Sequence, residues 1–411
     1  MDQYKADLAK PYMTDSIFLN SLVKEEYDRS RNEVEAYHIM ILKGNTPESE
    51  RLAYATADSL RSAIIGGADF GELAKKYSTD RGSYLSGGRM GWITTGRFPY
   101  AFEKMAFSLQ PGEISEIVES AQAYHVLKGG RKRPARGSVL TEHIMKMCRQ
   151  DATAEEEAAA KAAIDSIAKV VKADPEKFED LARELSDDKG SGRQGGRLQW
   201  FEAGMMVEPF DSAAFEIGIG EISEPFRSQF GWHIVRKLDA RGLATLDDMK
   251  PVLLQRFSSE QDERNALIRK NLIANLGKKH KGSLSKANID MLCNGVAETG
   301  IDSVWMVNAR NRATIGNIEI AKIGKKSICL ADWAENAMPL NITDGETACS
   351  RLRGILENFY DNSLISTEED WLYNNVAAYS NLLDEYRDGS LLYEASLQEV
   401  WDRAGKDTEG L

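Results

Sequence analysis

Residues 195–215 read GGRLQWFEAGMMVEPFDSAAF, and this stretch repeats one that the chain carries earlier. Residues 87–107 read GGRMGWITTGRFPYAFEKMAF and align with it without a gap. The same glycines, arginine, tryptophan and phenylalanines recur in both, at an offset of 108 residues. That offset holds over residues 70–125 of the first copy and 178–233 of the second, so the repeated unit is much longer than the quoted stretch.

Both copies follow the same order of predicted elements. Each opens with a strand, at residues 34–42 and 139–147, and two helices, a Gly-rich loop, a short helix and a last strand follow. In the second copy, Thr153-x-x-Glu156 is a capping box that opens the first helix. A repeat of about 105 residues with its own strands and helices is a tandem domain and not a solenoid unit. The order predicts an α+β fold with an antiparallel sheet in each copy.

The sequence outside the repeats has a different character. Residues 246–279 carry an apolar stripe among charged residues and predict one long helix. Residues 313–330 alternate in part around a Gly-Lys turn and predict a hairpin, and helices follow it as far as Trp401. We therefore expect five segments: an N-terminal helical arm at 1–33, two repeat domains at 34–137 and 138–243, a helical linker at 244–300, and a hairpin with a mostly helical region at 301–411.

Composition limits the class of protein. Hydrophobic residues make up 42% and charged residues 28%, as in soluble globular proteins. No apolar run approaches the roughly 20 residues that a membrane span needs, so we expect a chain that does not span a membrane. The net charge of −12 argues against a nucleic-acid partner, because binding phosphates requires a basic surface. The four cysteines form no CxxC pair, and we interpret them as small buried hydrophobic residues.

Four of the five histidines stand at equivalent places in the two copies. His38 and His143 lie on the first predicted strand, and His125 and His233 lie on the last. If the first and last strands pair at the centre of the sheet, both imidazoles of a copy lie on one face of it. The alternative is that each histidine is a core residue whose hydrogen bonds are satisfied locally.

An aspartate also recurs, as Asp80 in YSTDRGS and Asp188 in LSDDKGS. Two imidazoles and a carboxylate can bind a metal, act as acid and base, or orient one another. A metal is disfavoured because the spacing supplies no fourth ligand. Hydrolysis is disfavoured because Ser83 and Ser191 have Gly-rich flanks without a nucleophile-elbow pattern. A hydrogen-bond network that only satisfies buried polar groups is the structural alternative.

The quoted stretch resembles the parvulin family of peptidyl-prolyl cis/trans isomerases. GEIS follows it at residues 112–115 and 220–223, and FGWHIV closes the second copy at 230–235. The resemblance covers about 100 residues in each copy, which together make up about half of the chain. It implies a four-stranded antiparallel sheet with surrounding helices in each copy. Two tandem parvulin-like domains with helical flanks further resemble the SurA-type foldases of the Gram-negative periplasm.

The resemblance implies a catalytic group in the second copy. His143 and His233 stand at the family's paired histidines, and Asp188 stands where the family places Cys or Asp. Five further positions are implied to bind the substrate around its proline ring: Leu198, Met206, Phe210, Ser228 and Phe230.

The first copy provides a second candidate site at the matching positions: His38, His125, Asp80, Met90, Phe98 and Phe102. Phe98 replaces the methionine of the family's pocket, and SAQAY at residues 120–124 replaces a Phe-Gly-Trp type of sequence. We therefore expect the second copy to be the more active one.

The resemblance implies a peptidyl-prolyl cis/trans isomerase that assists the folding of unfolded envelope or outer-membrane proteins. Its partners would be unfolded or extended polypeptides that contain X–Pro bonds, and it would need no cofactor and no metal. The alternative is a non-catalytic chaperone that uses the parvulin-like domains as peptide-binding modules.

The resemblance also implies a periplasmic location. The N-terminus lacks the basic start and apolar core of a signal peptide, and the tail stops where the family usually continues. We therefore expect this chain to be a trimmed piece of a longer protein. The sequence makes no prediction of the oligomeric state.

Overall fold

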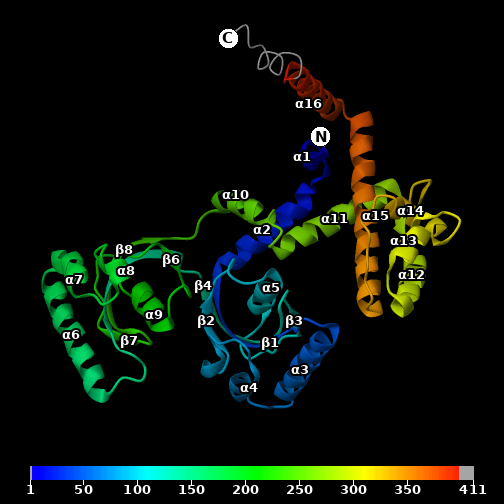
Figure 1. The fold of residues 1–411 in the computed structure, drawn as a ribbon. Coiled ribbons are helices and arrows are strands. Elements are labelled where there is room, and N and C mark those ends of the chain that lie inside the picture. The colour runs from blue at the N-terminus through cyan, green and yellow to red at the C-terminus, as the bar shows by residue number, and fades with distance from the viewer. Residues whose placement is uncertain (1, 398–411) are drawn as a thin grey trace, which may run out of the picture. The chain divides into compact units, whose positions relative to one another are not determined.

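The computed structural model describes residues 2–397 (Figure 1). By its internal contacts the chain forms two compact units. One unit is residues 20–265, which contain both repeats, and the other joins residues up to 19 with those from 266 onward. The finer division into five segments stays a prediction.

The first repeat is built on a four-stranded antiparallel sheet in the order β2-β1-β4-β3. Its elements, in chain order, are β1 (Asn32–Leu42), α3 (Pro47–Ile65), α4 (Phe70–Tyr77), a 3₁₀ turn (Tyr84–Ser86), β2 (Arg89–Ile93), α5 (Tyr100–Ser108), β3 (Val118–Glu119) and β4 (Ala123–Pro134). The two long strands, β1 and β4, pair at the centre of the sheet.

The second repeat reproduces this topology, in the order β6-β5-β8-β7. Its elements are β5 (Ser138–Met147), α6 (Ala154–Ala173), a 3₁₀ turn (Pro175–Lys177), α7 (Phe178–Leu185), α8 (Lys189–Gly192), β6 (Phe201–Glu202), α9 (Glu208–Glu216), β7 (Phe226–Ser228) and β8 (Gly231–Arg241). The predicted α+β fold, with a four-stranded antiparallel sheet and surrounding helices in each copy, is therefore confirmed, and so is the central pairing of the first and last strands.

Local sequence explains where the long helices begin. Thr46 caps α3 by accepting a hydrogen bond from the Ser49 backbone N–H, and Pro47 occupies the first turn. Thr153 and Glu156 form the predicted capping box of α6, because each side chain accepts from the backbone N–H of the other.

Strand alternation gives each sheet two apolar faces, each covered by its own helices. In the second repeat, Ile144 and Ile234 point to the face covered by α6 and α7, where Phe178 is fully buried. Val139, Val235 and the α9 residue Phe210 form the core on the opposite face. The paired histidines belong to this second face, since His143 packs edge-on against the Phe210 ring.

The prediction of a single helix over residues 246–279 is wrong, because α10 (Leu246–Phe257) ends and α11 (Glu263–His280) starts anew. Ser258, Ser259 and Asp262 lie in the break and offer side-chain and turn hydrogen bonds that compete with the helix. The break lets the buried Arg264 side chain reach the buried carboxylate of Glu26 on α2 (Ser16–Ser30), at 2.8 Å.

The other unit is mostly helical, with one small sheet. The predicted hairpin is confirmed as β10 (Glu319–Ile323) and β11 (Lys326–Cys329), and β9 (Gly282–Leu284), which periodicity did not reveal, pairs with β10. Its helices are α1 (Asp2–Met13), α12 (Lys286–Thr299), α13 (Ser303–Arg310), α14 (Leu330–Ala334), α15 (Gly345–Asn375) and α16 (Ala377–Ser396), and a 3₁₀ turn lies at Ile315–Asn317.

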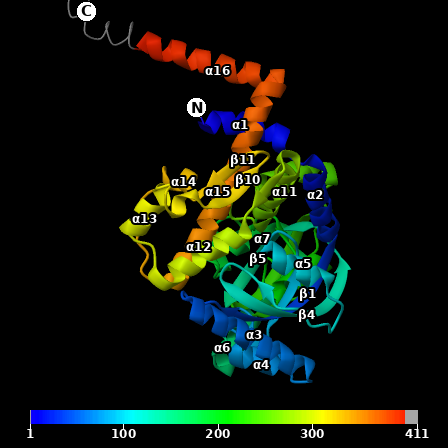
Figure 2. The same cartoon turned by 90° about the vertical axis from the view of Figure 1, so that its right-hand side faces the viewer.

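In this unit α12 lies along α15, and apolar side chains of both join one core (Figures 1 and 2). Trp401, where the last helix was predicted to end, lies outside the described residues. Within residues 2–397, none of the helices combines the length and the apolar character that crossing a membrane requires.

Replacing Phe178 by alanine should destabilise the second repeat by about 3–5 kcal/mol, because the fully buried ring would leave a cavity between α7 and the sheet. Native-state hydrogen exchange of the β5 and β8 amides measures this change. Val170→Ala, at an exposed position of α6, is the control and should stay within about 0.5 kcal/mol of wild type. Equal protection in the two variants would contradict the assigned core.

Candidate active site

The pairing of β5 with β8 places two histidines next to each other on one face of the second repeat. His143 lies opposite Val235 and His233 lies opposite Met145, so the two imidazoles are diagonal neighbours. Their ring centroids are 5.9 Å apart and the rings are nearly parallel, at 15°. Both side chains are buried. This register brings the two imidazoles together on one face of the sheet, as the sequence predicts.

The carboxylate of Asp188 reaches only one of these imidazoles. Its Oδ2 lies 2.9 Å from His143 Nε2 and accepts a hydrogen bond from the Ser191 hydroxyl at 2.5 Å, while its Oδ1 accepts from the Gly190 backbone N–H. Ser191 Oγ is also 2.9 Å from His143 Nε2. Asp188 occupies the N-cap of the short α8, and this position directs the carboxylate towards β5.

His233 has a separate partner, because its Nε2 lies 2.7 Å from the Ser228 hydroxyl. Ser228 accepts a hydrogen bond from the Phe230 backbone N–H, so its own proton can be donated to His233. The two imidazoles therefore stack and do not hydrogen-bond to each other. Among the described residues, neither His143 Nδ1 nor His233 Nδ1 has a hydrogen-bond partner.

This arrangement differs from a serine-hydrolase triad. In such a triad the carboxylate and the serine contact different nitrogens of one imidazole. Here Asp188 and Ser191 both contact Nε2 of His143. Within residues 2–397, no group of three or more His, Cys, Asp or Glu side chains is placed to hold a metal ion.

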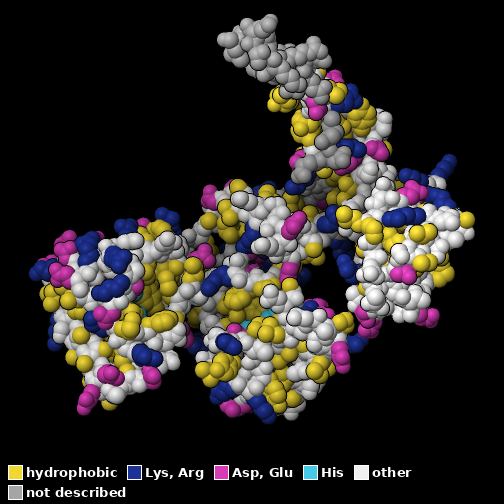
Figure 3. Space-filling view, viewed as in Figure 1, with side chains coloured by type: hydrophobic (Ala, Val, Ile, Leu, Met, Phe, Trp, Pro, Cys, Tyr) yellow, Lys and Arg dark blue, Asp and Glu magenta, His cyan; other side chains and the backbone are white. Residues whose placement is uncertain are grey.

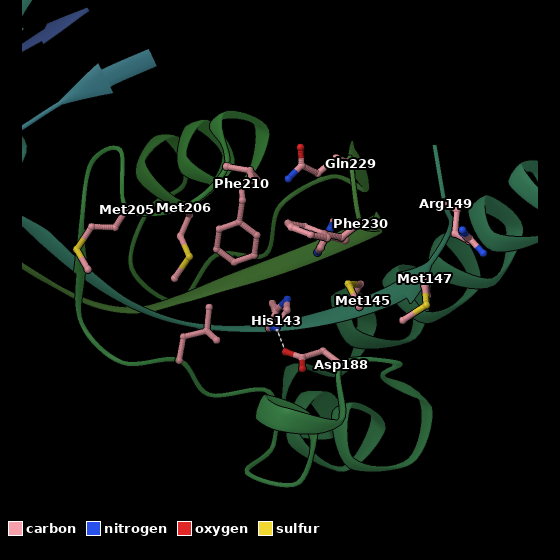
Figure 4. A pocket seen from close by; sticks show the side chains of 13 residues that line it. His143, Met145, Met147, Arg149, Asp188, Met205, Met206, Phe210, Gln229 and Phe230 are labelled. Carbon is pink, nitrogen blue, oxygen red and sulfur yellow. Dashed lines mark hydrogen bonds and ion pairs between the residues drawn. The ribbon is translucent and has the colours of Figure 1, made fainter. Parts of the chain in front are cut away.

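An apolar cavity of about 650 Å³ opens over the two histidines (Figure 4). Leu198, Met206, Phe210 and Phe230 line it, which are four of the five residues predicted to bind the substrate. The fifth, Ser228, is not among the lining residues, because it is buried behind the cavity against His233. Figure 4 shows the Phe210 ring from α9 between Met206 and Phe230, above His143.

Sequence reasoning missed several side chains of this cavity. Six further residues line it: Met145, Met147, Arg149, Met205, Val207 and Gln229. The strand period could have identified Met145 and Met147, which share the face of His143 along β5. The methionines make the wall unusually adaptable, because their side chains are unbranched and flexible.

Burial keeps the imidazoles of the second repeat neutral. It lowers the pKa of His233 to about 4, and the nearby His143 contributes in the same direction. Burial also lowers the pKa of His143, against the opposing effect of Asp188. For Asp188 burial alone would raise the pKa, but hydrogen bonds from Ser191 and His143 outweigh it, so the pKa is lowered and the carboxylate is charged at neutral pH.

The first repeat has the same polar network. His38 Nε2 lies 2.7 Å from Asp80 Oδ2 and 3.1 Å from Ser83, and its ring stacks on His125 at 5.8 Å. His125 Nε2 lies 3.0 Å from the hydroxyl of Ser120. The hydrogen bond from His38 is the main cause that lowers the pKa of Asp80, and burial lowers the pKa of His125 to about 4.

The apolar part of the first site is filled differently. Phe98, at the position of Met206, stacks on Phe102 with their ring centroids 5.1 Å apart. Met90 packs against the same core cluster. The second aromatic ring thus covers Phe102, whereas the equivalent Phe210 ring faces the cavity of the second repeat.

Both repeats match the family of PPIC-type PPIase (rotamase) domains, at residues 38–130 and 143–239. The chain therefore carries two parvulin-type rotamase domains in tandem, as the sequence predicts. The histidine pair, its aspartate and its serines lie within these two matched ranges.

Among individual relatives, the chain is similar to SurA chaperones. Chaperone SurA of Nitrosococcus oceani is 34% identical over 211 residues, covering 50% of this chain and 48% of the relative. Chaperone SurA of Photorhabdus laumondii is 31% identical over 238 residues, covering 56% and 54%. The chain thus spans about half the length of these curated relatives.

A solved structure, the peptidylprolyl isomerase PrsA of Bacillus anthracis, is 29% identical and aligns with 28% of this chain and 51% of its own, with a TM-score of 0.23.

The lowered pKa of His233 predicts a specific loss of stability in acid. Its folded pKa of about 4 lies below the ordinary value of 6.5, so the stabilisation is present above pH 6.5 and is lost as the pH falls towards 4. Between pH 7 and pH 5 the free energy of unfolding of the wild type should therefore fall by about 2 kcal/mol more than that of His233→Gln. Urea unfolding at both pH values measures the difference. Parallel pH curves for the two proteins would show that burial does not hold this imidazole neutral.

Proposed function

We propose that the second repeat catalyses the cis/trans isomerisation of X–Pro peptide bonds, with His143, His233 and Asp188 as the catalytic group. The observation that carries this proposal is the apolar cavity whose floor is a pair of neutral, stacked imidazoles. Peptidyl-prolyl isomerase activity is also what a rotamase domain family implies for both repeats.

The reaction makes modest chemical demands. The C–N bond of an X–Pro amide has partial double-bond character, with a rotational barrier of about 18–20 kcal/mol. Rotation breaks no covalent bond, so the enzyme needs no nucleophile. It needs to bind the twisted amide more tightly than either planar isomer. Lowering the barrier by about 5–7 kcal/mol would accelerate the reaction roughly 10⁴–10⁵-fold.

The cavity can bind the twisted amide by holding the prolyl ring in place while the residue before the proline rotates. Leu198, Met206 and Phe210 form an apolar wall for the prolyl ring. Phe230, in the turn before β8, and the methionines of β5 line the side where the rest of the substrate peptide would lie. An apolar, water-poor site favours the twisted amide, because twisting removes resonance and reduces the charge on the carbonyl oxygen.

The two imidazoles supply a fixed electrostatic environment in this scheme. They are neutral at pH 7, and each has its own hydrogen-bond partner, Asp188 for His143 and Ser228 for His233. Orientation by fixed partners matters, because a site that does not reorganise stabilises a transition state most effectively.

Two differences favour the second repeat over the first. In the first repeat the Phe98 ring stacks on Phe102, whereas in the second repeat the flexible Met206 side chain stands at that position and Phe210 lines the cavity. In the second repeat Gly231 has a φ of 151°, and a Cβ there would lie 2.1 Å from the Lys146 carbonyl oxygen. Ala123 occupies the equivalent position of the first repeat and has no positive φ, so the backbone differs at this one residue although the strand keeps the same pairing.

We further propose that the chain acts on unfolded or extended polypeptides with X–Pro bonds, as a folding factor for envelope or outer-membrane proteins in the periplasm. The support is its similarity to relatives named as SurA chaperones. Figure 3 shows hydrophobic side chains gathered over the middle of the second repeat, where α8 and α9 lie. An exposed Phe230 beside the cavity suits a flexible apolar client.

A non-catalytic chaperone is the second candidate function. The covered aromatic pair of the first repeat favours it for that domain. In the other unit, α16 exposes Leu391, Leu392 and Tyr393, which would suit contact with apolar polypeptide segments. If the chain is a non-catalytic chaperone, both repeats bind peptides and neither accelerates isomerisation.

Asp188→Ala should lower kcat/KM for a short X–Pro peptide at least tenfold, because His143 loses the carboxylate that orients it. Met206→Ala should also lower it, by opening the wall of the cavity. Prolyl exchange measured by NMR reports both rates.

Asp80→Ala is the matched change in the first repeat and decides which domain is active. We expect Asp80→Ala to retain most of the wild-type kcat/KM for the X–Pro peptide. A larger loss in Asp80→Ala than in Asp188→Ala would move the activity to the first repeat. A wild type that does not accelerate exchange but still suppresses aggregation of an unfolded client would leave only the chaperone function.

A further inference from the structure

Asp211 is a buried carboxylate on α9, the helix that contributes Phe210 to the cavity of the second repeat. It follows Phe210 on α9, and its side chain is 4% exposed. Its Oδ2 accepts a hydrogen bond from the Gly204 backbone N–H at 3.0 Å. Gly204 begins the wall loop, which we define as residues 204–207 between β6 and α9. Met205, Met206 and Val207 of this loop all line the cavity.

The hydrogen bond from the Gly204 N–H to Asp211 fixes the first residue of the wall loop, where the backbone conformation is unusual. Gly204 has a φ of 76°, in the left-handed region, so the chain reverses sharply there. Immediately before the helix, the Val207 carbonyl accepts from the N–H groups of Phe210 and Asp211. The Asp211 carboxylate therefore connects the first turn of α9 to the other end of the loop that precedes it.

The first repeat contains the same device at the equivalent position. Glu103 is fully buried on α5, next to Phe102, and its Oε1 accepts from the N–H groups of Arg97 and Phe98 at 2.8 and 3.0 Å. Glutamate is one methylene longer than aspartate, and Glu103 contacts the amides equivalent to those of Met205 and Met206, one and two residues after the equivalent of Gly204. An aspartate in one repeat and a glutamate in the other both accept hydrogen bonds from backbone amides of the preceding loop. This shared contact, and not the length of the acidic side chain, is therefore the feature that the fold requires.

The carboxylate is costly to bury, which argues against a purely space-filling role. Burial raises the pKa of Asp211 to about 6, although the Gly204 N–H and Arg136 act in the opposite direction. Arg136 Nη2 lies 3.5 Å from Oδ2, and Oδ1 has no hydrogen-bond partner among residues 2–397. A buried and incompletely paired carboxylate destabilises a fold relative to an apolar side chain of similar size.

We propose that Asp211 is a positioning residue of the prolyl cavity, which fixes Met205 and Met206 in the wall by holding the Gly204 N–H. This inference rests on the proposed isomerase function for its effect on activity. It does not depend on that function for the structural effect on the loop.

The test compares Asp211→Ala, which removes the acceptor, with Asp211→Asn, which keeps an oxygen that can accept from Gly204. Hydrogen exchange of the Gly204 and Met206 amides is measured together with isomerase kinetics, at a temperature where both variants are folded. Asp180→Ala, an exposed aspartate of α7 paired with Arg183, is the matched control.

We expect Asp211→Ala to expose the Gly204 amide and to lower kcat/KM about tenfold, mainly through KM, because the ring-binding wall is displaced. Asp211→Asn should restore both properties to within about threefold of wild type. Unchanged Gly204 protection in Asp211→Ala, or a loss of activity in Asp211→Asn as large as in Asp211→Ala, would overturn the inference. A wild type without isomerase activity would refute the proposed function instead, and the amide protection would still test the role of Asp211.

Discussion

The register between the first and last strands of each repeat is the constraint on which the site depends. In the second repeat it places His143 diagonally across from His233 on one face, while Ile144 and Ile234 enter the core on the other. A slip of one residue would exchange these faces and bury both imidazoles under α6 and α7. The apolar burial on both sides of the sheet therefore fixes the position of the polar pair. The hydrogen bonds of Asp188 and Ser228 then orient rings whose positions are already set.

A comparison of the two repeats shows that the polar network and the apolar wall of the site vary independently. The histidine pair, its aspartate and its serines keep nearly the same distances in both copies. The apolar wall does not, because a phenylalanine stands in one copy where a methionine stands in the other. One scaffold therefore carries the same polar network beside two different apolar walls, and the polar network by itself does not identify an active site.

Much of the fold could be predicted from local sequence, because its signals are local. The capping box at Thr153 and the strand alternation around His143 depend only on neighbouring residues. The break between α10 and α11 has a local signal in Ser258, Ser259 and Asp262, but the apolar stripe continues across it and predicts one helix. The ion pair between Arg264 and Glu26, which the break allows, joins residues far apart in the chain and could not be predicted. β9 has three residues, too few to show a period.

The candidate site shows the same division between local and non-local information. The histidines and the aromatic wall residues are predictable from the duplication and from the resemblance to parvulins. That Ser228 would be buried behind His233, and that Asp188 would contact only one imidazole, depends on side-chain rotamers and on the N-cap position of α8. Neither the side-chain rotamers nor this N-cap contact could be predicted from a sequence pattern.

The proposed isomerisation requires that a prolyl ring bind between Phe210, Met206 and the paired imidazoles of the second repeat. The most direct measurement is of intermolecular NOEs from the ring protons of an X–Pro peptide, bound to the chain with its methionine methyl groups labelled. A ring bound at this site gives NOEs to the Met206 methyl group and to the Phe210 ring. NOEs confined to residues outside this cavity, in a complex that still forms, would contradict it.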